Sequence, residues 1–265
     1  MPHLLKVAET SEVSATAQVE QSLFSFLSVF PFRPSIPVST REELSMTLDS
    51  RLVSLAAAGH KLVENGFVHG SGGNISLCWD ELCYISPAGA RLDRLTSADF
   101  VPLNVHTQNT WQLRRASGEH AMHLACYRAR PDAATVLHVH PPNCVALGCA
   151  GLSIPAITPD FFLAVGSQTP LLPYLTPTTQ ELADAVAALI VDHDTVLLRN
   201  HGLVVVAEST ESALSKVLVV EEAARIVLLA HAASGQCSAL SAEEIKELER
   251  VTGKYHRRRK PETET

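Results

Sequence analysis

The chain has 265 residues, of which 46% are hydrophobic and 18% charged, and its formal net charge is −7. This length and composition predict one folded domain of ordinary to large size and exclude a disordered chain. The negative charge offers no basic surface for a phosphate backbone, so we expect no nucleic-acid partner.

No segment of the sequence predicts a membrane span. The apolar stretch at residues 23–38 contains three prolines and an arginine, which a helix across a bilayer does not tolerate. The N-terminal residues lack the cleavage site of a signal peptide. The six cysteines have no C-x-x-C spacing, and we expect them to be reduced thiols. We therefore predict a cytoplasmic protein without membrane contact.

The first predicted helix follows an N-terminal arm, residues 1–42, which could pack on the body of the protein or on a neighbouring subunit. Thr40 and Glu43 have the spacing of a capping box, and leucines at helical spacing continue to Gly66, which is placed to end the helix. The glycine-rich turn His69-Gly-Ser-Gly-Gly-Asn-Ile-Ser76 then leads into a strand. Its backbone amides could form an anion-binding nest, and a plain turn is the alternative.

Turn and periodicity signals predict short strands at residues 82–85 and within 100–113, a tight turn at Ser86-Pro-Ala-Gly89, and a helix at 116–128 that begins near Ser117. Glu119 falls in the first turn of this helix, where the helix dipole favours a carboxylate without any catalytic role. His123 lies on the same helix face, and we favour packing over metal binding for it.

The strand at residues 135–140 ends in two histidines that are one residue apart. Side chains alternate faces along a strand, so His138 and His140 project to the same side, with Leu137 and Val139 behind them. Two imidazoles in this arrangement can bind one metal ion. Two ordinary histidines at a strand end are the alternative.

The remaining segments predict a mixed α/β layered fold. A turn or short helix at residues 143–148 precedes a long, proline-rich connection at 151–173. Thr178 and Glu181 predict a capping box for a helix through residue 190. Two strand-like runs then meet at Asn200-His201-Gly202, followed by helices at 211–232 and 241–251 and a charged tail, 251–265.

Three histidines with one open position form the pattern of a catalytic zinc site, and His201 could join His138 and His140 in such a set. All-imidazole ligation suits Zn²⁺, while Mn²⁺, Co²⁺ and Fe²⁺ remain open. The metal would act as a Lewis acid on a carbonyl. If Glu119 reaches the same pocket, it could move the proton that carbon–carbon cleavage requires.

Five motifs, taken in order, resemble the class II aldolase/adducin family. They are His69-Gly-Ser-Gly-Gly-Asn-Ile-Ser76, Ser86-Pro-Ala-Gly89, Ser117-Gly-Glu119, Val136-Leu-His-Val-His140 and Leu198-Arg-Asn-His-Gly202. The resemblance runs from about residue 43 to residue 255. It implies a three-layer αβα fold over residues 43–250, with a central, largely antiparallel sheet flanked by helices. It also implies a homotetramer.

The resemblance implies that His138, His140 and His201 bind the metal and that Glu119 is the acid/base. The substrate phosphate site of the family matches Gly72, Gly73, Asn74, Ser86, Gly89 and Ser117. Two hydroxyls of that site are missing, because Gly118 and Ala88 stand where serine and threonine are usual, and this puts a phosphorylated substrate in doubt. Tyr255 matches a tyrosine that reaches a neighbouring subunit's site, so it is a further catalytic candidate.

The predicted function is a metal-dependent carbon–carbon lyase, an aldolase or a decarboxylase, acting on a small hydroxy-carbonyl compound or a hydroxy or oxo acid. The stretch at residues 158–174 looks more like the family's decarboxylases of 3-oxo acids than like its aldolases. One alternative is a sugar-phosphate 4-epimerase of the same fold, although such enzymes tend to carry aspartate where Glu119 stands. The other is a non-catalytic domain similar to the adducin head, which lacks the histidines.

Overall fold

The computed structural model describes residues 47–107 and 113–254. The predicted capping box at Thr40 and Glu43, most of the charged tail and Tyr255 lie outside these residues. The helices in chain order are α3 (Leu48–Glu64), α5 (His120–Ala129), α6 (Pro142–Ala150), α7 (Pro159–Val165), α8 (Gln180–Ile190), α9 (Thr210–Ser234) and α10 (Ala242–Thr252). The strands are β1 (Asn74–Trp79), β2 (Leu82–Ile85), β3 (Val101–Asn104), β4 (Thr135–Val139), β5 (Ile154–Pro155), β6 (Gln168–Thr169), β7 (Leu171–Leu172), β8 (Thr195–Leu198) and β9 (Gly202–Ala207).

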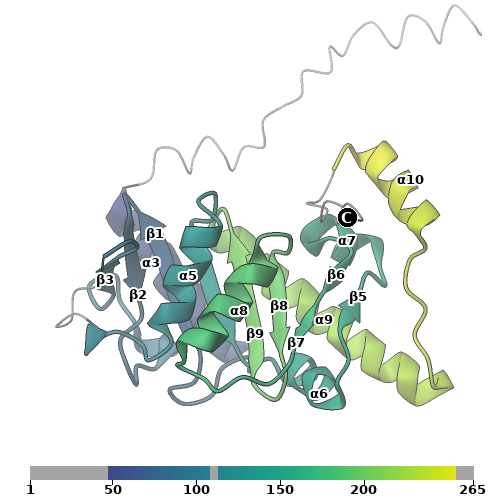
Figure 1. Ribbon diagram of the computed structural model, residues 1–265, viewed down its shortest axis with the longest axis horizontal. Helices are drawn as coiled ribbons and strands as arrows, with labels where there is room; N and C mark the ends of the chain where they lie inside the picture. The colour runs from purple at the N-terminus through teal and green to yellow at the C-terminus, as the bar shows by residue number, and fades with distance from the viewer. Residues whose placement is uncertain (1–46, 108–112, 255–265) are drawn as a thin grey trace, which may run out of the picture. The chain divides into compact units, whose positions relative to one another are not determined.

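Seven strands form one sheet in the order β3-β2-β1-β4-β9-β8-β7 (Figure 1). All neighbouring pairs are antiparallel except β7 and β8, which confirms the largely antiparallel sheet. Strand β4 lies at the centre, and its five residues are all buried. Strands β5 and β6 form a separate two-stranded sheet.

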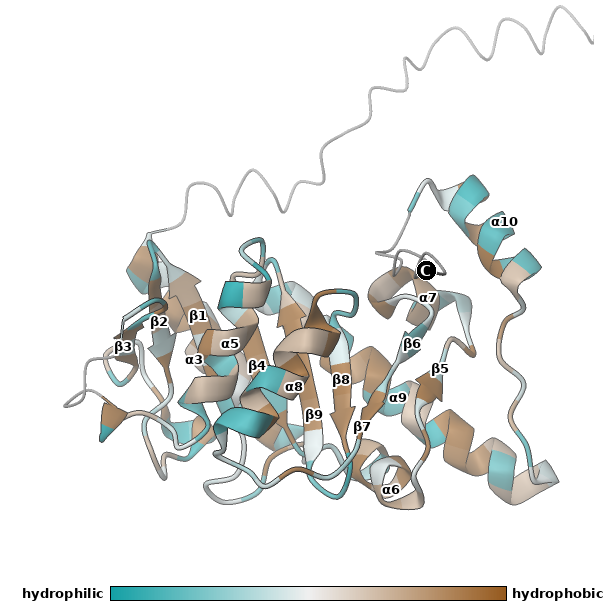
Figure 2. Cartoon of the chain, in the orientation of Figure 1, coloured by the Kyte–Doolittle hydropathy of each residue, from teal (hydrophilic) through white to brown (hydrophobic). Residues whose placement is uncertain are grey.

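Helices cover both faces of the sheet, which confirms the three-layer αβα fold (Figure 1). Leu137 and Val139 point into a core shared with α3, α6, α7 and α9, whereas Val136 points into a core shared with α5 and α8. Figure 2 shows the hydrophobic colouring of β4, β8 and β9, which is expected for strands buried on both faces. The same alternation places His138 on the face of the sheet that carries α5.

Local capping signals decide where two of the helices begin. Helix α3 starts after Thr47, whose hydroxyl accepts the N–H of Ser50, so the start predicted at Thr40 is wrong for this helix. Helix α8 starts after Thr179, whose hydroxyl accepts the N–H of Leu182. The capping box predicted at Thr178 is therefore wrong by one residue, and Thr178 itself has a left-handed backbone with φ of 66°.

The connection predicted at residues 151–173 contains regular structure. Helix α7 lies within it, capped by the hydroxyl of Thr158, which accepts the N–H of Phe161. Phe161 and Phe162 then face the core and are at most 2% exposed. Burial of these two rings explains why a proline-rich segment adopts a helix here. Among the described residues, no helix is both long and apolar enough to span a membrane.

A buried ion cluster joins the start of β8 to the end of α5 and to α9. Asp194 accepts hydrogen bonds from Arg130 at 2.9 Å and from Lys216 at 2.7 Å. Burial by itself raises the pKa of Asp194, but the charge of Lys216 and the hydrogen bonds from both cations outweigh it and lower the pKa. Asp194 therefore compensates two cations that are each less than a tenth exposed.

Asp194→Asn is expected to destabilise the fold by about 2–4 kcal/mol, because it leaves Arg130 and Lys216 buried without their shared carboxylate. The pKa of Asp194 is lower in the folded protein than in the unfolded chain. Its contribution to stability is therefore present above pH of about 4 and lost as the pH falls below that value. Urea unfolding at pH 7 and at pH 3 measures both effects. Glu247→Gln, which removes a fully exposed ion pair with Arg250, is the control and should leave the midpoint unchanged.

Candidate metal and catalytic site

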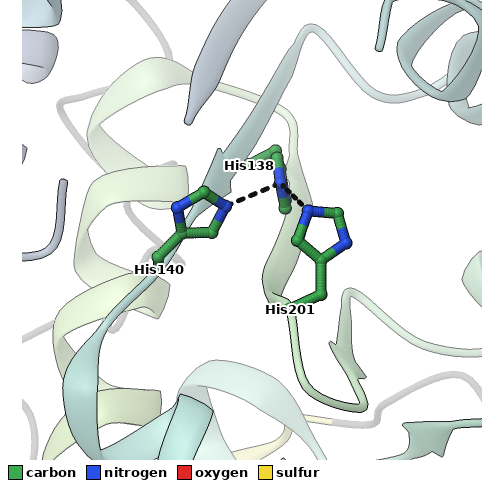
Figure 3. Close-up of side chains that lie close together, drawn as sticks. All are labelled: His138, His140 and His201. Carbon is green, nitrogen blue, oxygen red and sulfur yellow. Dashed lines mark hydrogen bonds between the residues drawn. The ribbon is translucent and has the colours of Figure 1, made fainter. Parts of the chain in front are cut away.

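Three histidine side chains converge near one end of the central strands (Figure 3). His138 belongs to β4, His140 follows it directly, and His201 lies in the turn between β8 and β9. Strands β4 and β8 both pair antiparallel with β9, so they run in the same direction. Their C-terminal ends, near which the histidines lie, are therefore on the same side of the sheet. The Nε2 atom of His138 lies 3.1 Å from Nε2 of His140 and 3.2 Å from Nε2 of His201.

These separations fit one tetrahedral metal ion. Zn–N bonds of 2.0–2.1 Å place two ligand nitrogens about 3.3 Å apart, close to the observed distances. The three ligand atoms all lie within 4.8 Å of one another. Nδ1–H of His138 donates to the carbonyl of Leu203 at 3.1 Å, so in the neutral ring Nε2 carries the lone pair that can bind a metal.

The histidines are electrostatically suited to bind a cation. Burial, followed by the charge of His138, lowers the pKa of His140 and of His201 to about 4, so both rings are neutral at pH 7. A neutral imidazole keeps a lone pair for coordination. Oε1 of Glu119 and Nδ1 of His201 are buried without a hydrogen-bond partner among the described residues. A buried oxygen of this kind beside three imidazoles fits a site that holds a cation.

The carboxylate of Glu119 lies beside the three histidines. Glu119 is the N-cap residue of α5, not a first-turn residue as predicted, and its side chain makes no capping hydrogen bond. Oε2 lies 3.2 Å from Nε2 of His138, and Oε1 lies 3.5 Å from Nε2 of His201. Burial alone raises the pKa of Glu119, but the charge and hydrogen bond of His138 and the amide of Asn74 outweigh it and lower the pKa.

Glycines allow the backbone to approach the histidines closely. A Cβ atom at Gly72 would lie 3.2 Å from Nδ1 of His140, and one at Gly73 would lie 2.8 Å from the carbonyl of His138. A Cβ atom at Gly202 would overlap the carbonyl of Val139 and lie 2.5 Å from Cδ2 of His140. These glycines therefore have a packing role beside His138 and His140, whatever they contribute to substrate binding.

Gly202→Ala is expected to displace His140 and to weaken metal retention, because backbone and ring both occupy the space of the new methyl group. Overpacking of this kind costs about 1–3 kcal/mol. Metal analysis of the purified protein and urea unfolding measure the two effects. Gly235→Ala is the matched control. The positive φ of Gly235 should strain the variant, but nothing lies within 4 Å of the added Cβ atom, so the metal should be retained. Full metal content in Gly202→Ala would contradict the expectation.

The remaining predicted substrate-binding residues lie on the loops around Glu119. The amide of Ser117 donates to the carbonyl of Ser86, which pairs the Ser86-Pro-Ala-Gly89 turn with the segment that precedes α5. The hydroxyl of Ser86 accepts the N–H of Ile75, and that of Ser117 accepts the N–H of Glu119. Gly89 has φ of 69°, as the tight turn requires. The binding roles of these residues remain predictions.

Sequence reasoning names Asn74 only as a substrate-binding residue and misses two polar contacts at or near the site. Asn74, opposite His138 in the β1–β4 register, donates to Oε2 of Glu119 at 2.9 Å, and its own carbonyl accepts from His123. Burial lowers the pKa of His123 to about 3, so its ring is neutral, and the packing role favoured for it agrees with its complete burial. Glu221 of α9 accepts the backbone N–H groups of Asn143 and Cys144, which caps the helix that follows His140. No local signal marks either contact, since the partners are 45 or more residues apart.

Comparison with known proteins identifies the family. The model of the class II aldolase and adducin N-terminal domain matches residues 53–228. L-fuculose phosphate aldolase of Escherichia coli (strain K12) is 33% identical over 180 residues, which cover 68% of this chain and 83% of the aldolase. 5-deoxy-D-ribulose 1-phosphate aldolase of Bacillus thuringiensis is 33% identical over 184 residues, which cover 68% and 85% of the two chains.

Solved structures agree with this assignment. YgbL from Klebsiella pneumoniae, described as a putative aldolase/epimerase/decarboxylase, has a TM-score of 0.69 and 29% identity, covering 77% of this chain and all of YgbL. An L-fuculose 1-phosphate aldolase has a TM-score of 0.70 and 28% identity, covering 78% and 98%. The αβα fold, the sequence similarity and the convergent histidines agree, and the chain belongs to the class II aldolase and adducin N-terminal domain family.

Proposed function

We propose that this chain is a metal-dependent carbon–carbon lyase that acts on a small hydroxy-carbonyl compound or a hydroxy or oxo acid. The observation that carries the proposal is the carboxylate of Glu119, which lies within 3.5 Å of two of the three clustered imidazoles. A Zn²⁺, Mn²⁺, Co²⁺ or Fe²⁺ ion held by His138, His140 and His201 would supply a Lewis acid for the substrate carbonyl. Glu119 would hold and transfer the proton that bond cleavage requires.

Aldol cleavage is the reaction that the relatives favour. Both curated relatives described above are named aldolases and share 33% of their aligned residues with this chain. Decarboxylation is the second candidate, because the segment at residues 158–174 resembles the family's decarboxylases and both reactions leave a carbanion equivalent beside a carbonyl. Retention of all three histidines and of glutamate at position 119 argues against an adducin-like binding domain and against an epimerase.

The polar groups near Glu119 support a substrate with one anionic or polar end. The hydroxyls of Ser86 and Ser117 each accept a backbone N–H and keep their own proton for donation to a ligand. A side chain at position 118 would be crowded, since a Cβ atom there would lie 3.2 Å from the methyl group of Thr178. We propose that a carboxylate or neutral polar group binds here at least as well as a phosphate. Gly72, Gly73, Asn74 and Gly89 would contribute to the same binding site.

The oligomeric part of the proposal comes from the family resemblance. We propose a homotetramer in the cytoplasm in which Tyr255 completes a neighbouring subunit's site. Light scattering measures the mass of the assembly directly. A monomer would contradict the shared site and with it the role of Tyr255.

Incubation of the metal-loaded protein with a substrate panel tests the reaction. The panel contains phosphorylated and unphosphorylated ketose aldols, 3-oxo acids and hydroxylated aromatic acids. Released aldehyde identifies an aldolase, released carbon dioxide a decarboxylase, and an inverted hydroxyl carbon without release an epimerase. The metal-free protein and Glu119→Gln are the controls. The lyase proposal fails if the metal-loaded wild type cleaves no member of the panel.

A further inference from the structure

A chain of four hydrogen bonds, three of them buried and the last part-buried, runs from the interior of the protein to Glu119. Tyr127 contacts Ser76 at 2.8 Å, Ser76 contacts Nδ1 of His123 at 2.7 Å, Nε2 of His123 contacts Oδ1 of Asn74 at 2.6 Å, and Nδ2 of Asn74 donates to Oε2 of Glu119 at 2.9 Å. Ser76 and His123 are fully buried, and Asn74 and Tyr127 are 4% exposed. Nothing in the metal site itself requires so long a polar chain.

The geometry of the two elements explains why these residues meet. Asn74 and Ser76 are two residues apart on β1, so both project toward α5 with a spacing of about 6.7 Å. His123 and Tyr127 are four residues apart on α5, which spaces them by about 6.0 Å on one helix face. The two spacings are similar, so the two side chains of β1 can contact the two side chains of α5.

The chemistry at one end of the chain fixes the direction of every hydrogen bond. Nδ2 of Asn74 donates to Oε2 of Glu119, so its carbonyl oxygen, which can only accept, faces His123. His123 must then carry its proton on Nε2, and its bare Nδ1 accepts from Ser76. Ser76, having donated its only proton, accepts from Tyr127. All four donors therefore point toward Glu119.

We infer that His123 is a positioning residue for catalysis, which acts through Asn74 to hold Oε2 of Glu119 and leaves Oε1 as the oxygen that exchanges protons with the substrate. Oε1 has no hydrogen-bond partner among the described residues, whereas Oε2 is held by Asn74. A proton on Oε2 would weaken the hydrogen bond from Asn74, because a hydroxyl oxygen is a poorer acceptor than a carboxylate oxygen. A proton on Oε1 leaves the whole chain unchanged. The inference rests on the proposed function, because it assigns a task within that reaction.

His123→Leu and His123→Gln separate positioning from packing. His123→Leu removes the donor to Asn74 and is expected to lower kcat about 10–100-fold, as partners of active-site ligands commonly do, with metal content unchanged and KM moved less than about threefold. His123→Gln keeps an N–H that can reach Asn74 and is expected to recover most of kcat. Leu124→Ala is the control, because Leu124 lies on the same helix but takes no part in the chain of hydrogen bonds. It should lower the melting temperature without lowering kcat. An equal loss of kcat in Leu124→Ala, or no loss in His123→Leu, would overturn the inference.

A double variant tests whether His123 acts through Asn74. His123→Leu in an Asn74→Ala background is expected to add less than about twofold to the loss of kcat, because the amide that His123 orients is already gone. Losses that multiply would show that His123 acts by another route and would overturn the inference.

Nitrogen NMR of the ring of His123 provides a readout that needs no substrate. The shifts of Nδ1 and Nε2 show which atom carries the proton, and the Nε2–H tautomer alone is expected in the wild type. The Nδ1–H tautomer would overturn the inference even if the lyase is active. If the substrate panel shows no cleavage but the ring is Nε2–H, the proposed reaction fails while the polarity of the chain stands, so the two failures are distinguishable.

Discussion

His138→Ala and His201→Ala are each expected to lose the bound metal and all measurable lyase activity. The three Nε2 atoms meet within a small volume, and each ring contributes one ligand atom, so removal of one leaves two protein ligands. Loss of an outer-shell partner already costs about 10–100-fold in metal affinity or activity, and loss of a ligand should cost at least about 100-fold. Metal analysis of the purified variants, together with turnover of the best panel substrate, measures both quantities.

His60→Ala is the matched control for these variants, because His60 is an exposed histidine of α3 that lies outside the cluster. It should retain both metal and activity. His201→Ala is the more informative of the two ligand variants, since His201 is partly exposed in a turn, whereas His138 is fully buried in the central strand. Stoichiometric metal in purified His201→Ala would show that His201 is not a ligand.

Glu119→Gln is expected to retain the metal and to lose turnover by about 10²–10⁴-fold, the usual contribution of a positioned acid/base. The amide has the shape of the carboxylate and keeps an oxygen that can accept from Asn74, but it cannot take up a proton near neutral pH. The loss should appear in kcat and in kcat/KM alike, because the missing proton transfer belongs to the transition state.

The control for this variant is Glu64→Gln at the exposed end of α3, which should change neither quantity. Metal content separates the two roles that Glu119 could have. If Glu119→Gln lost the metal together with activity, the carboxylate would be a required ligand and its assignment as acid/base would be wrong. Unchanged turnover with full metal would assign the proton transfer to another group.

The sequence by itself determined the elements whose signals are local. Alternation along β4 correctly places Leu137 and Val139 in one core and His138 on the opposite face. Glycine at the end of a periodic stretch correctly marks the end of α3, where Gly66 has a left-handed backbone with φ of 73°. These predictions succeed because side-chain period and capping depend on neighbours within a few residues. Local signals fail where neighbouring capping residues compete, as at Thr178 against Thr179.

Only the tertiary structure decided how the site is held together. The sequence predicts Glu119 as the acid/base and favours packing for His123, but it gives neither residue a hydrogen-bond partner, and the fold brings both to Asn74. It also places Glu221 over the amides of α6, a contact between residues 77 or more positions apart. Such polar contacts have no sequence period, because they form only when two elements that are distant in the sequence pack against each other. Local periodicity therefore predicts the layers and the histidine pair, and the packing of α5 on β1 determines how Glu119 is held beside them.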